Sequence, residues 1–226
     1  MRATDLTTKR AILGEFARRG SARVLGVAVA VLAAARATVG DFGRGDLLAI
    51  GVTVLITGSV EWTIHTHLLH APEDSWVSRT LHTGDGHRQH HLDPPDVDWI
   101  LLRTVDAAVF VAMFGLFTAA WSVPLMWASG SSVTGGFLTA YLCAAAGLLH
   151  YEWVHLMVHT RYRATSRYYR NLDRRHRLHH FRNEHYWMGV TSHTGDRLMR
   201  TLPRERTDVP LSPTARTLAG SDANPD

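Results

Sequence analysis

The fold of this 226-residue chain is decided by residues 107–151, which read AAVFVAMFGLFTAAWSVPLMWASGSSVTGGFLTAYLCAAAGLLHY. This segment of 45 residues contains no Asp, Glu, Lys or Arg, and only the Gly- and Ser-rich stretch at 128–136 interrupts its apolar character. A membrane-spanning helix needs about 20 apolar residues, so the segment has the length of two crossings joined by a tight turn. We therefore expect a helical hairpin in a membrane.

A second hairpin is expected upstream. Val24–Ala35 and Leu47–Val60 are shorter apolar runs, and the charged residues between them could snorkel or lie at the surface. These charged residues are Arg36, Asp41, Arg44 and Asp46. Because the runs are short, a buried helical core of a soluble protein is the alternative. The sequence thus predicts an all-α fold with four transmembrane helices in two hairpins.

The distribution of charge predicts the orientation of these helices. Residues 1–23 carry six basic groups against two acidic ones, and residues 156–226 carry thirteen Arg against seven acids. Cytoplasmic segments of membrane proteins are enriched in Lys and Arg, so both termini are expected in the cytoplasm. Arginines that flank membrane spans favour anionic lipid headgroups over nucleic acid as their partner.

Three regions follow from this pattern. Residues 1–23 form a basic cytoplasmic segment, residues 24–201 form the membrane domain, and residues 202–226 are expected to be a disordered tail because they are poor in apolar residues.

The histidines are unusual in number and in position. The chain has fifteen His but a single Cys, Cys143, which excludes a disulfide framework, a cysteine zinc site and c-type haem attachment. Most of the histidines fall into four clusters, and the predicted topology places all four at the cytoplasmic face. The clusters are EWTIHTHLLH (61–70), HRQHH (87–91), HYEWVHLMVH (150–159) and HRLHH (176–180).

The spacing within these clusters suits metal binding. Positions i, i+3 and i+4 share one face of a helix, so each HxxHH unit can converge, as can His155 with His159. His65 and His70 are five residues apart and would need a helix end or a long reach to aim at one point. Imidazole binds iron, zinc, copper and nickel, and one ion takes roughly four to six ligands. Ten histidines are therefore too many for one metal ion and suitable for two.

Several other chemistries lack their sequence patterns. A ferritin-like carboxylate site needs two Glu-x-x-His units, and only Glu152 with His155 matches. The HExxH motif of zinc proteases is absent, as are the Gly-rich nucleotide-binding loops and the G-x-S-x-G motif of serine hydrolases.

From about Leu47 to Thr201, the sequence resembles the fatty acid hydroxylase superfamily of histidine-rich di-metal membrane oxygenases, which includes sterol desaturases. The resemblance rests on EWTIHTHLLH, HRQHHLDPPD, YEWVHLMVH, HRLHHFRN and GVTSHTGD, in this order. It implies four spans and a cytoplasmic helical cap that holds a histidine-ligated di-metal site. Members usually carry Trp-Asp after GVTS, whereas this chain has Gly195-Asp196, which puts the shape of that part of the cap in doubt.

The resemblance also implies a set of metal ligands. These are His65, His70, His87, His90, His91, His155, His159, His176, His179 and His180. Five histidines are additional to the family pattern and are expected at the surface by default: His67, His82, His150, His185 and His193. His67 could replace His65 as the ligand that pairs with His70. We expect Glu61, Glu152 and Asp196 to orient ligand imidazoles by accepting their second N–H.

The implied activity is that of a membrane-bound di-iron oxygenase. It would use O2 and external electrons to hydroxylate an unactivated C–H bond of a lipid-like substrate, with two iron ions as cofactors, although purified protein could contain zinc. No side chain beyond the metal ligands is expected to be catalytic. The chain lacks flavin, haem and iron–sulfur motifs, so a separate donor such as ferredoxin with its reductase is implied.

Two alternatives stay open. A lipid desaturase or a carotenoid hydroxylase would use the same metal site, although the third histidine box of carotenoid hydroxylases is usually wider. A histidine-rich membrane metal carrier without redox chemistry would need ionisable residues along its spans, and residues 107–151 supply none apart from His150.

Overall fold

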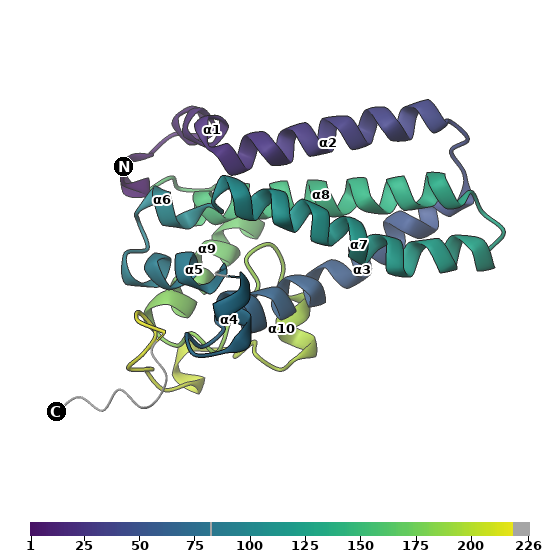
Figure 1. Ribbon diagram of the computed structural model, residues 1–226. Helices are drawn as coiled ribbons and strands as arrows, with labels where there is room; N and C mark the ends of the chain where they lie inside the picture. The colour runs from purple at the N-terminus through teal and green to yellow at the C-terminus, as the bar shows by residue number, and fades with distance from the viewer. Residues whose placement is uncertain (82, 219–226) are drawn as a thin grey trace. The chain divides into compact units, whose positions relative to one another are not determined.

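The computed structural model describes residues 1–81 and 83–218 (Figure 1). Every regular element in these residues is a helix, and they contain no strand. In chain order the elements are η1 (Ala3–Asp5), α1 (Lys9–Arg18), α2 (Gly20–Val39), α3 (Arg44–Ile64), η2 (His65–Leu69), α4 (Trp76–Leu81), α5 (Thr83–Leu92), α6 (Val97–Ile100), α7 (Thr104–Ala128), α8 (Val133–Val158), α9 (Arg167–Phe181), α10 (Thr194–Leu198) and η3 (Arg206–Asp208). The predicted all-α fold is confirmed.

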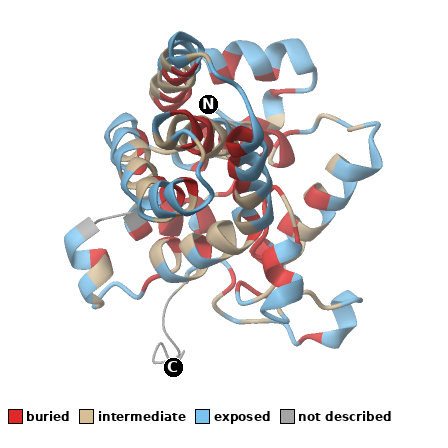
Figure 2. Cartoon of the chain, turned by 90° about the vertical axis from the view of Figure 1, so that its right-hand side faces the viewer, coloured by how far each residue is buried: buried red, intermediate tan, exposed pale blue. Residues whose placement is uncertain are grey.

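Four segments are long and apolar enough to cross a membrane. They are Gly20–Val39, Arg44–Leu69, Val97–Ala128 and Val133–Val158. Exposed residues occur along all four, and they include large apolar side chains such as Leu55, Leu116 and Trp127. Figure 2 colours the exposed residues of the chain pale blue. Apolar side chains on an outer face are stable where lipid is the solvent. The four predicted spans are confirmed, and the chain is a multi-pass membrane protein.

The chain divides into two compact units. One unit, here called the span unit, comprises Glu15–Thr57 and Leu102–Glu152. In it α2 packs against α7, and a Cβ atom on Gly20 would lie only 2.0 Å from Oγ1 of Thr104. Glycine at this position therefore permits the close approach of the two helices, as small residues do between membrane helices.

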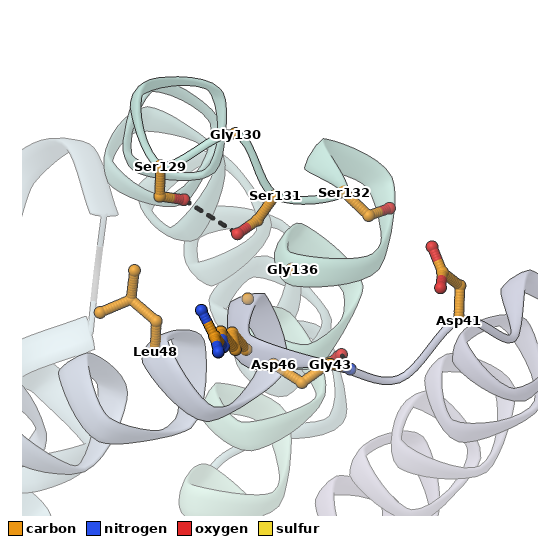
Figure 3. A pocket seen from close by; sticks show the side chains of 11 residues that line it. Asp41, Gly43, Asp46, Leu48, Ser129, Gly130, Ser131, Ser132 and Gly136 are labelled. Atoms are coloured by element: carbon orange, nitrogen blue, oxygen red, sulfur yellow. Dashed lines mark hydrogen bonds between the residues drawn. The ribbon is translucent and has the colours of Figure 1, made fainter.

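A buried ion pair explains how charged residues fit between the first two spans. The Arg36 guanidinium lies 2.7 Å from the Asp46 carboxylate and donates to Oγ1 of Thr139 and to the Gly40 carbonyl. Arg36 and Asp46 are both buried. This corrects the expectation that they snorkel or lie at the surface. Charges that neutralise each other can be kept away from water, which lets α2 and α3 extend beyond the apolar runs. Asp46 also lines a pocket at the turn between α7 and α8 (Figure 3).

The second unit, here called the histidine unit, comprises Met1–Gly14, Gly58–Leu101 and Trp153–Asp226. The N-terminal segment is held in it by a hydrogen bond of 2.7 Å from the Ala3 amide to the Pro95 carbonyl. Of the segment 202–226, for which composition predicts disorder, residues 202–218 are described, and Val209 and Ala215 are buried there. Residues 219–226 lie outside the described residues.

Candidate metal centre

A π-helical turn at the end of α3 brings the first two predicted ligands together. In η2 the His70 amide donates to the His65 carbonyl, five residues back, at 3.0 Å. This wider turn places residues i and i+5 on the same face, where an α-helix would place i and i+4. The ring centroids of His65 and His70 are 4.8 Å apart. The turn lies at a helix end, which is one of the two arrangements expected for a pair of histidines five residues apart.

Each HxxHH unit divides its histidines between two places. His87 and His91 of α5 go to one group, while His90 goes to the other. Likewise, His176 and His180 of α9 share one group, while His179 belongs to the other. Residues i and i+4 are neighbours on a helix face, whereas the residue at i+3 projects to the other side of that line, so one motif can serve two ions.

The result is two groups of five histidines. The first, here called cluster A, contains His65, His70, His87, His91 and His179. The second, here called cluster B, contains His90, His155, His159, His176 and His180. Within each cluster the candidate ligand nitrogens all lie within 4.8 Å of one another. The two clusters adjoin, since the rings of His91 and His180 have centroids 4.2 Å apart.

The nitrogen positions fit a bound metal ion. Nε2 of His87 lies 3.1 Å from Nε2 of both His65 and His70 in cluster A. In cluster B, Nε2 of His176 lies 2.9 Å from that of His159 and 3.0 Å from that of His180. Nitrogens bound at about 2.1 Å to one ion at right angles would be about 3.0 Å apart. A metal ion would occupy the point that these nitrogens surround.

Unsatisfied nitrogens support the same reading. Both ring nitrogens of His90 and Nε2 of His91 and of His179 are buried without a hydrogen-bond partner. Buried polar atoms in proteins almost always have a partner, and each exception needs an explanation such as a missing ion. Each of these histidines offers one nitrogen to its cluster, so a metal in each cluster would satisfy Nε2 of His91, Nε2 of His179 and one nitrogen of His90.

The electrostatics of the clusters keep the imidazoles neutral. For the histidines outside the membrane-spanning helices, burial lowers the pKa first, and the neighbouring histidines lower it further. The pKa of His91 falls to about 3, although its bond to the Ala215 carbonyl opposes the fall. The pKa values lie well below 6.5 for His70, His87, His90, His159, His176, His179 and His180. Neutral imidazole is the form that binds metals.

Backbone carbonyls orient three of the rings in cluster A. Nδ1 of His65 contacts the Met188 carbonyl at 2.5 Å, Nδ1 of His91 contacts that of Ala215 at 2.7 Å, and Nδ1 of His179 contacts that of Tyr186 at 2.9 Å. A carbonyl can only accept, so each of these Nδ1 atoms carries the proton. The lone pair is thereby left on Nε2, where it is available to a metal.

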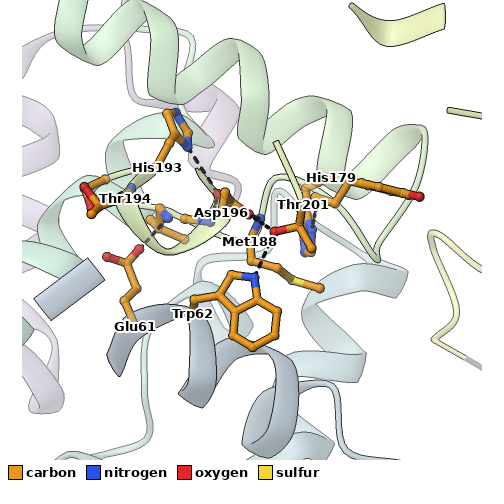
Figure 4. A network of polar contacts seen from close by, with 12 residues as sticks. Glu61, Trp62, His179, Met188, His193, Thr194, Asp196 and Thr201 are labelled. Carbon is orange, nitrogen blue, oxygen red and sulfur yellow. Dashed lines mark hydrogen bonds and ion pairs between the residues drawn. The ribbon is translucent and has the colours of Figure 1, made fainter. Parts of the chain in front are cut away.

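The expected carboxylates act one step further out. Asp196 accepts from the amides of Met188 and Gly189 at 2.9 and 2.8 Å and from the Thr201 hydroxyl, as Figure 4 shows in part. Asp196 therefore fixes the backbone at Met188, whose carbonyl contacts His65. We had expected Asp196 to bond directly to a ligand imidazole. Burial opposes ionisation of Asp196, but hydrogen bonds from His193, Thr201 and these amides outweigh it, so its pKa lies below its usual value.

Glu61 and Glu152 likewise accept hydrogen bonds from groups other than the ligand imidazoles expected for them. Glu61, at the end of α3, accepts from the amides of Val190 and Thr191 and from the Thr191 hydroxyl. It ties α3 to the same loop that Asp196 holds. Glu152 of α8 accepts from the Leu102 amide at 3.0 Å within the span unit.

A close approach of α10 to α3 leaves no room for a side chain at Gly195. A Cβ atom on Gly195 would lie 2.3 Å from the Gly58 carbonyl oxygen and 2.5 Å from Cβ of Trp62. A side chain at position 195 would therefore push α10 away from α3. Glycine at this position therefore permits the close packing of α10 against α3.

The additional histidines differ in their surroundings. His67 is exposed and packs edge-on against Trp62, with ring centroids 5.7 Å apart, so the structure places His65 and not His67 in cluster A. His150 and His185 are exposed as expected. His193 is buried at 6% exposure with Nδ1 3.4 Å from Oδ2 of Asp196, which corrects the expectation of a surface position (Figure 4). His82 lies outside the described residues.

These features define an integral-membrane helical protein with two adjoining clusters of five histidines each, in which eight rings are buried and those of His70 and His159 are half-buried. A family model described as fatty acid hydroxylase matches residues 48–201, which is more than half of the chain. The chain belongs to the fatty acid hydroxylase family, a family of membrane hydroxylase and desaturase type. No curated protein and no solved structure matches it.

Proposed function

We propose that this protein is a di-iron oxygenase that hydroxylates an unactivated C–H bond of a lipid-like substrate with O2 and external electrons. The observation that carries the proposal is the pair of adjoining all-imidazole clusters, whose nearest rings, His91 and His180, are 4.2 Å apart. Ten neutral donors in two groups of five suit two iron ions.

Bound iron ions would supply the activation of dioxygen and the removal of hydrogen from carbon. The protein contributes the environment of that chemistry. Burial of the ligand rings excludes bulk water, which protects a reactive oxidant from side reactions. The carbonyls of Met188, Tyr186 and Ala215 hold three rings in one tautomer, so that their Nε2 atoms stay directed at the metal.

An apolar substrate is favoured by the way the ligands continue the spans. His65 follows α3 directly, and His155 lies within the last turns of α8. A lipid could keep its chain beside these apolar helices while its reacting carbon reaches the histidines. The excess of Arg in residues 1–23 and 156–226 supports a cytoplasmic position for both termini and for the metal centre.

The electron donor is expected to dock on α9. Arg167, Arg170, Arg174 and Arg177 of this helix are exposed, whereas His176, His179 and His180 on its other side are buried. A positively charged face steers an acidic partner such as ferredoxin. Because the same helix supplies metal ligands, a donor bound there would have a short path to the metal centre.

A desaturase or a carotenoid hydroxylase would use the same ligands, and a non-catalytic metal carrier is the alternative from another class. One experiment separates them. Anaerobically purified protein is loaded with Fe(II), reduced by ferredoxin and its reductase, and given O2 with a lipid extract, with the His180→Ala variant as the inactive control.

A hydroxylase will consume O2 and yield products heavier by one oxygen atom, whereas a desaturase will yield products that have lost two hydrogens. Bound iron without O2 uptake or a changed lipid, given a competent donor, would refute the oxygenase reading and favour the carrier.

A further inference from the structure

The C-terminal segment Val209–Leu218, here called the clasp, lies against the metal centre although it follows the part of the chain that matches the family. The matched residues end at Thr201. Within the clasp, Val209 and Ala215 are buried at 5% and 3% exposure. The amides of Thr217 and Leu218 donate back to the Thr214 carbonyl, which closes a turn around Ala215.

This turn aims one carbonyl at a candidate ligand. The Ala215 carbonyl accepts from Nδ1 of His91 at 2.7 Å, and His91 is fully buried. Nε2 of His91 is left buried without a partner and belongs to cluster A. The clasp thus makes the same contact to His91 that Met188 and Tyr186 make to His65 and His179.

The clasp is fastened to the end of α9 by the side chain and the backbone of Arg182. Arg182 donates from Nε and Nη2 to the Val209 carbonyl at 3.1 and 2.7 Å, and the Arg182 carbonyl accepts from the Ser212 amide at 2.7 Å. Arg182 follows directly after α9, which carries His179 and His180. These bonds therefore fix the position of the clasp, which contacts His91, relative to α9, which carries His179 and His180.

A buried carboxylate provides the second fastening. The Thr214 hydroxyl donates to Oε1 of Glu184 at 2.5 Å, and Glu184 is 2% exposed. Burial opposes ionisation of Glu184, but hydrogen bonds from Thr214 and Ser212 outweigh it and lower its pKa. A buried, ionised carboxylate makes strong hydrogen bonds, so Thr214 is held firmly next to the carbonyl that serves His91.

We propose that the clasp is a working part of the metal centre: Ala215 fixes the tautomer of His91, so the metal in cluster A depends on residues beyond the family domain, while the metal in cluster B does not. This inference rests on the proposed metal centre. Partners that orient a ligand imidazole are worth roughly 10–100-fold in metal affinity. Loss of the clasp should lower the metal affinity of cluster A by that factor.

Two truncated chains test the proposal through their metal content. One ends at Asp208 and lacks the clasp, and the matched control ends at Leu218 and lacks only residues 219–226. Each is purified in detergent and titrated with Zn(II) or anaerobic Fe(II). We expect the control to bind about two ions per chain, as the full chain does, and the shorter chain to keep one and bind the other roughly 10–100-fold more weakly. Two tight ions in both truncated chains would overturn the proposal.

A double-mutant comparison shows whether the effect passes through His91. His91→Ala should itself weaken one ion, and removing the clasp from that variant should add little, because both changes act on the same contact. Additive losses, or loss of the cluster B ion as well, would show a general structural role and overturn the route through His91.

A full-length variant guards against misfolding of the truncated chain. Thr214→Val removes the hydroxyl bond to Glu184 and should weaken the cluster A ion, whereas Thr207→Val at an exposed position should not. Equal affinities in both variants would count against the clasp. A full chain that binds two ions but never consumes O2 would refute the proposed oxygenase and leave this inference standing.

Discussion

Asp196→Asn perturbs the metal centre without touching a candidate ligand. Asp196 is fully buried, and its two oxygens accept from the amides of Met188 and Gly189 and from the Thr201 hydroxyl. Asparagine has nearly the same shape, but it replaces one accepting oxygen with a donating NH2 group. If the remaining oxygen keeps its bonds to Met188 and Thr201, the Gly189 amide faces another donor and loses its partner.

The size of the effect follows from these bonds. A buried N–H without a partner costs about 1–3 kcal/mol. The bonds that survive change from charged to neutral and lose about half their strength. The free energy of unfolding should therefore fall by about 3 kcal/mol, which corresponds to roughly 6–12 °C in Tm for a chain of this size. The Met188 carbonyl then holds His65 less firmly, and metal affinity at cluster A should drop roughly 10-fold or more.

Thermal unfolding and metal titration of the detergent-solubilised protein measure both effects. Asp208→Asn is the matched control, because Asp208 is exposed and accepts from the Glu205 amide at the surface, so its loss should shift the free energy of unfolding by about 0.5 kcal/mol. The reasoning is refuted if Asp196→Asn has the Tm and metal affinity of the unchanged protein, or if the two variants behave alike.

Three further predictions concern the ligands and the partner. His65→Ala should bind one ion fewer per chain in metal titration, whereas His67→Ala should bind as many as the unchanged protein; equal losses would reverse the choice between them. The metal-free protein should lose stability as the pH falls below about 6.5, because the unfolded histidines take up protons that the buried ones, with pKa values down to about 3, do not. Each such histidine costs about 1.4 kcal/mol at pH 5.5, and a flat Tm between pH 7.5 and 5.5 would contradict the burial of neutral imidazoles. Reversing charge in Arg170→Glu with Arg174→Glu should raise the KM for an acidic donor several-fold at low salt and leave metal content intact; an unchanged KM would place the donor elsewhere.

Much of the fold and of the metal centre could be predicted from the sequence, because both depend on side chains with distinctive chemistry. Membrane spans are recognised by the absence of charge, and the apolar stretch from Ala107 to Tyr151 indeed corresponds to two long helices, α7 and α8. The ten histidines expected from the family pattern are the ten that the structure brings together. Features that depend on residue type, such as apolar spans and histidine ligands, can be recognised in the sequence.

Other parts of the centre could not be foreseen, for physical reasons. The π-helical turn that joins His65 to His70 depends on one backbone bond, which any residue type can make. Ala215 contributes a carbonyl, and every residue has one, so nothing in its side chain marks it. The spacing of HxxHH shows that three rings lie near each other, but it does not show that His90 leaves the group of His87 and His91.

The metal content of the intact chain tests the central claim most directly. Protein purified without oxygen and saturated with Fe(II) should retain close to two iron ions per chain, since each cluster offers five neutral imidazoles. Retention of one iron ion or fewer at saturation would contradict a two-iron centre built from these ten histidines.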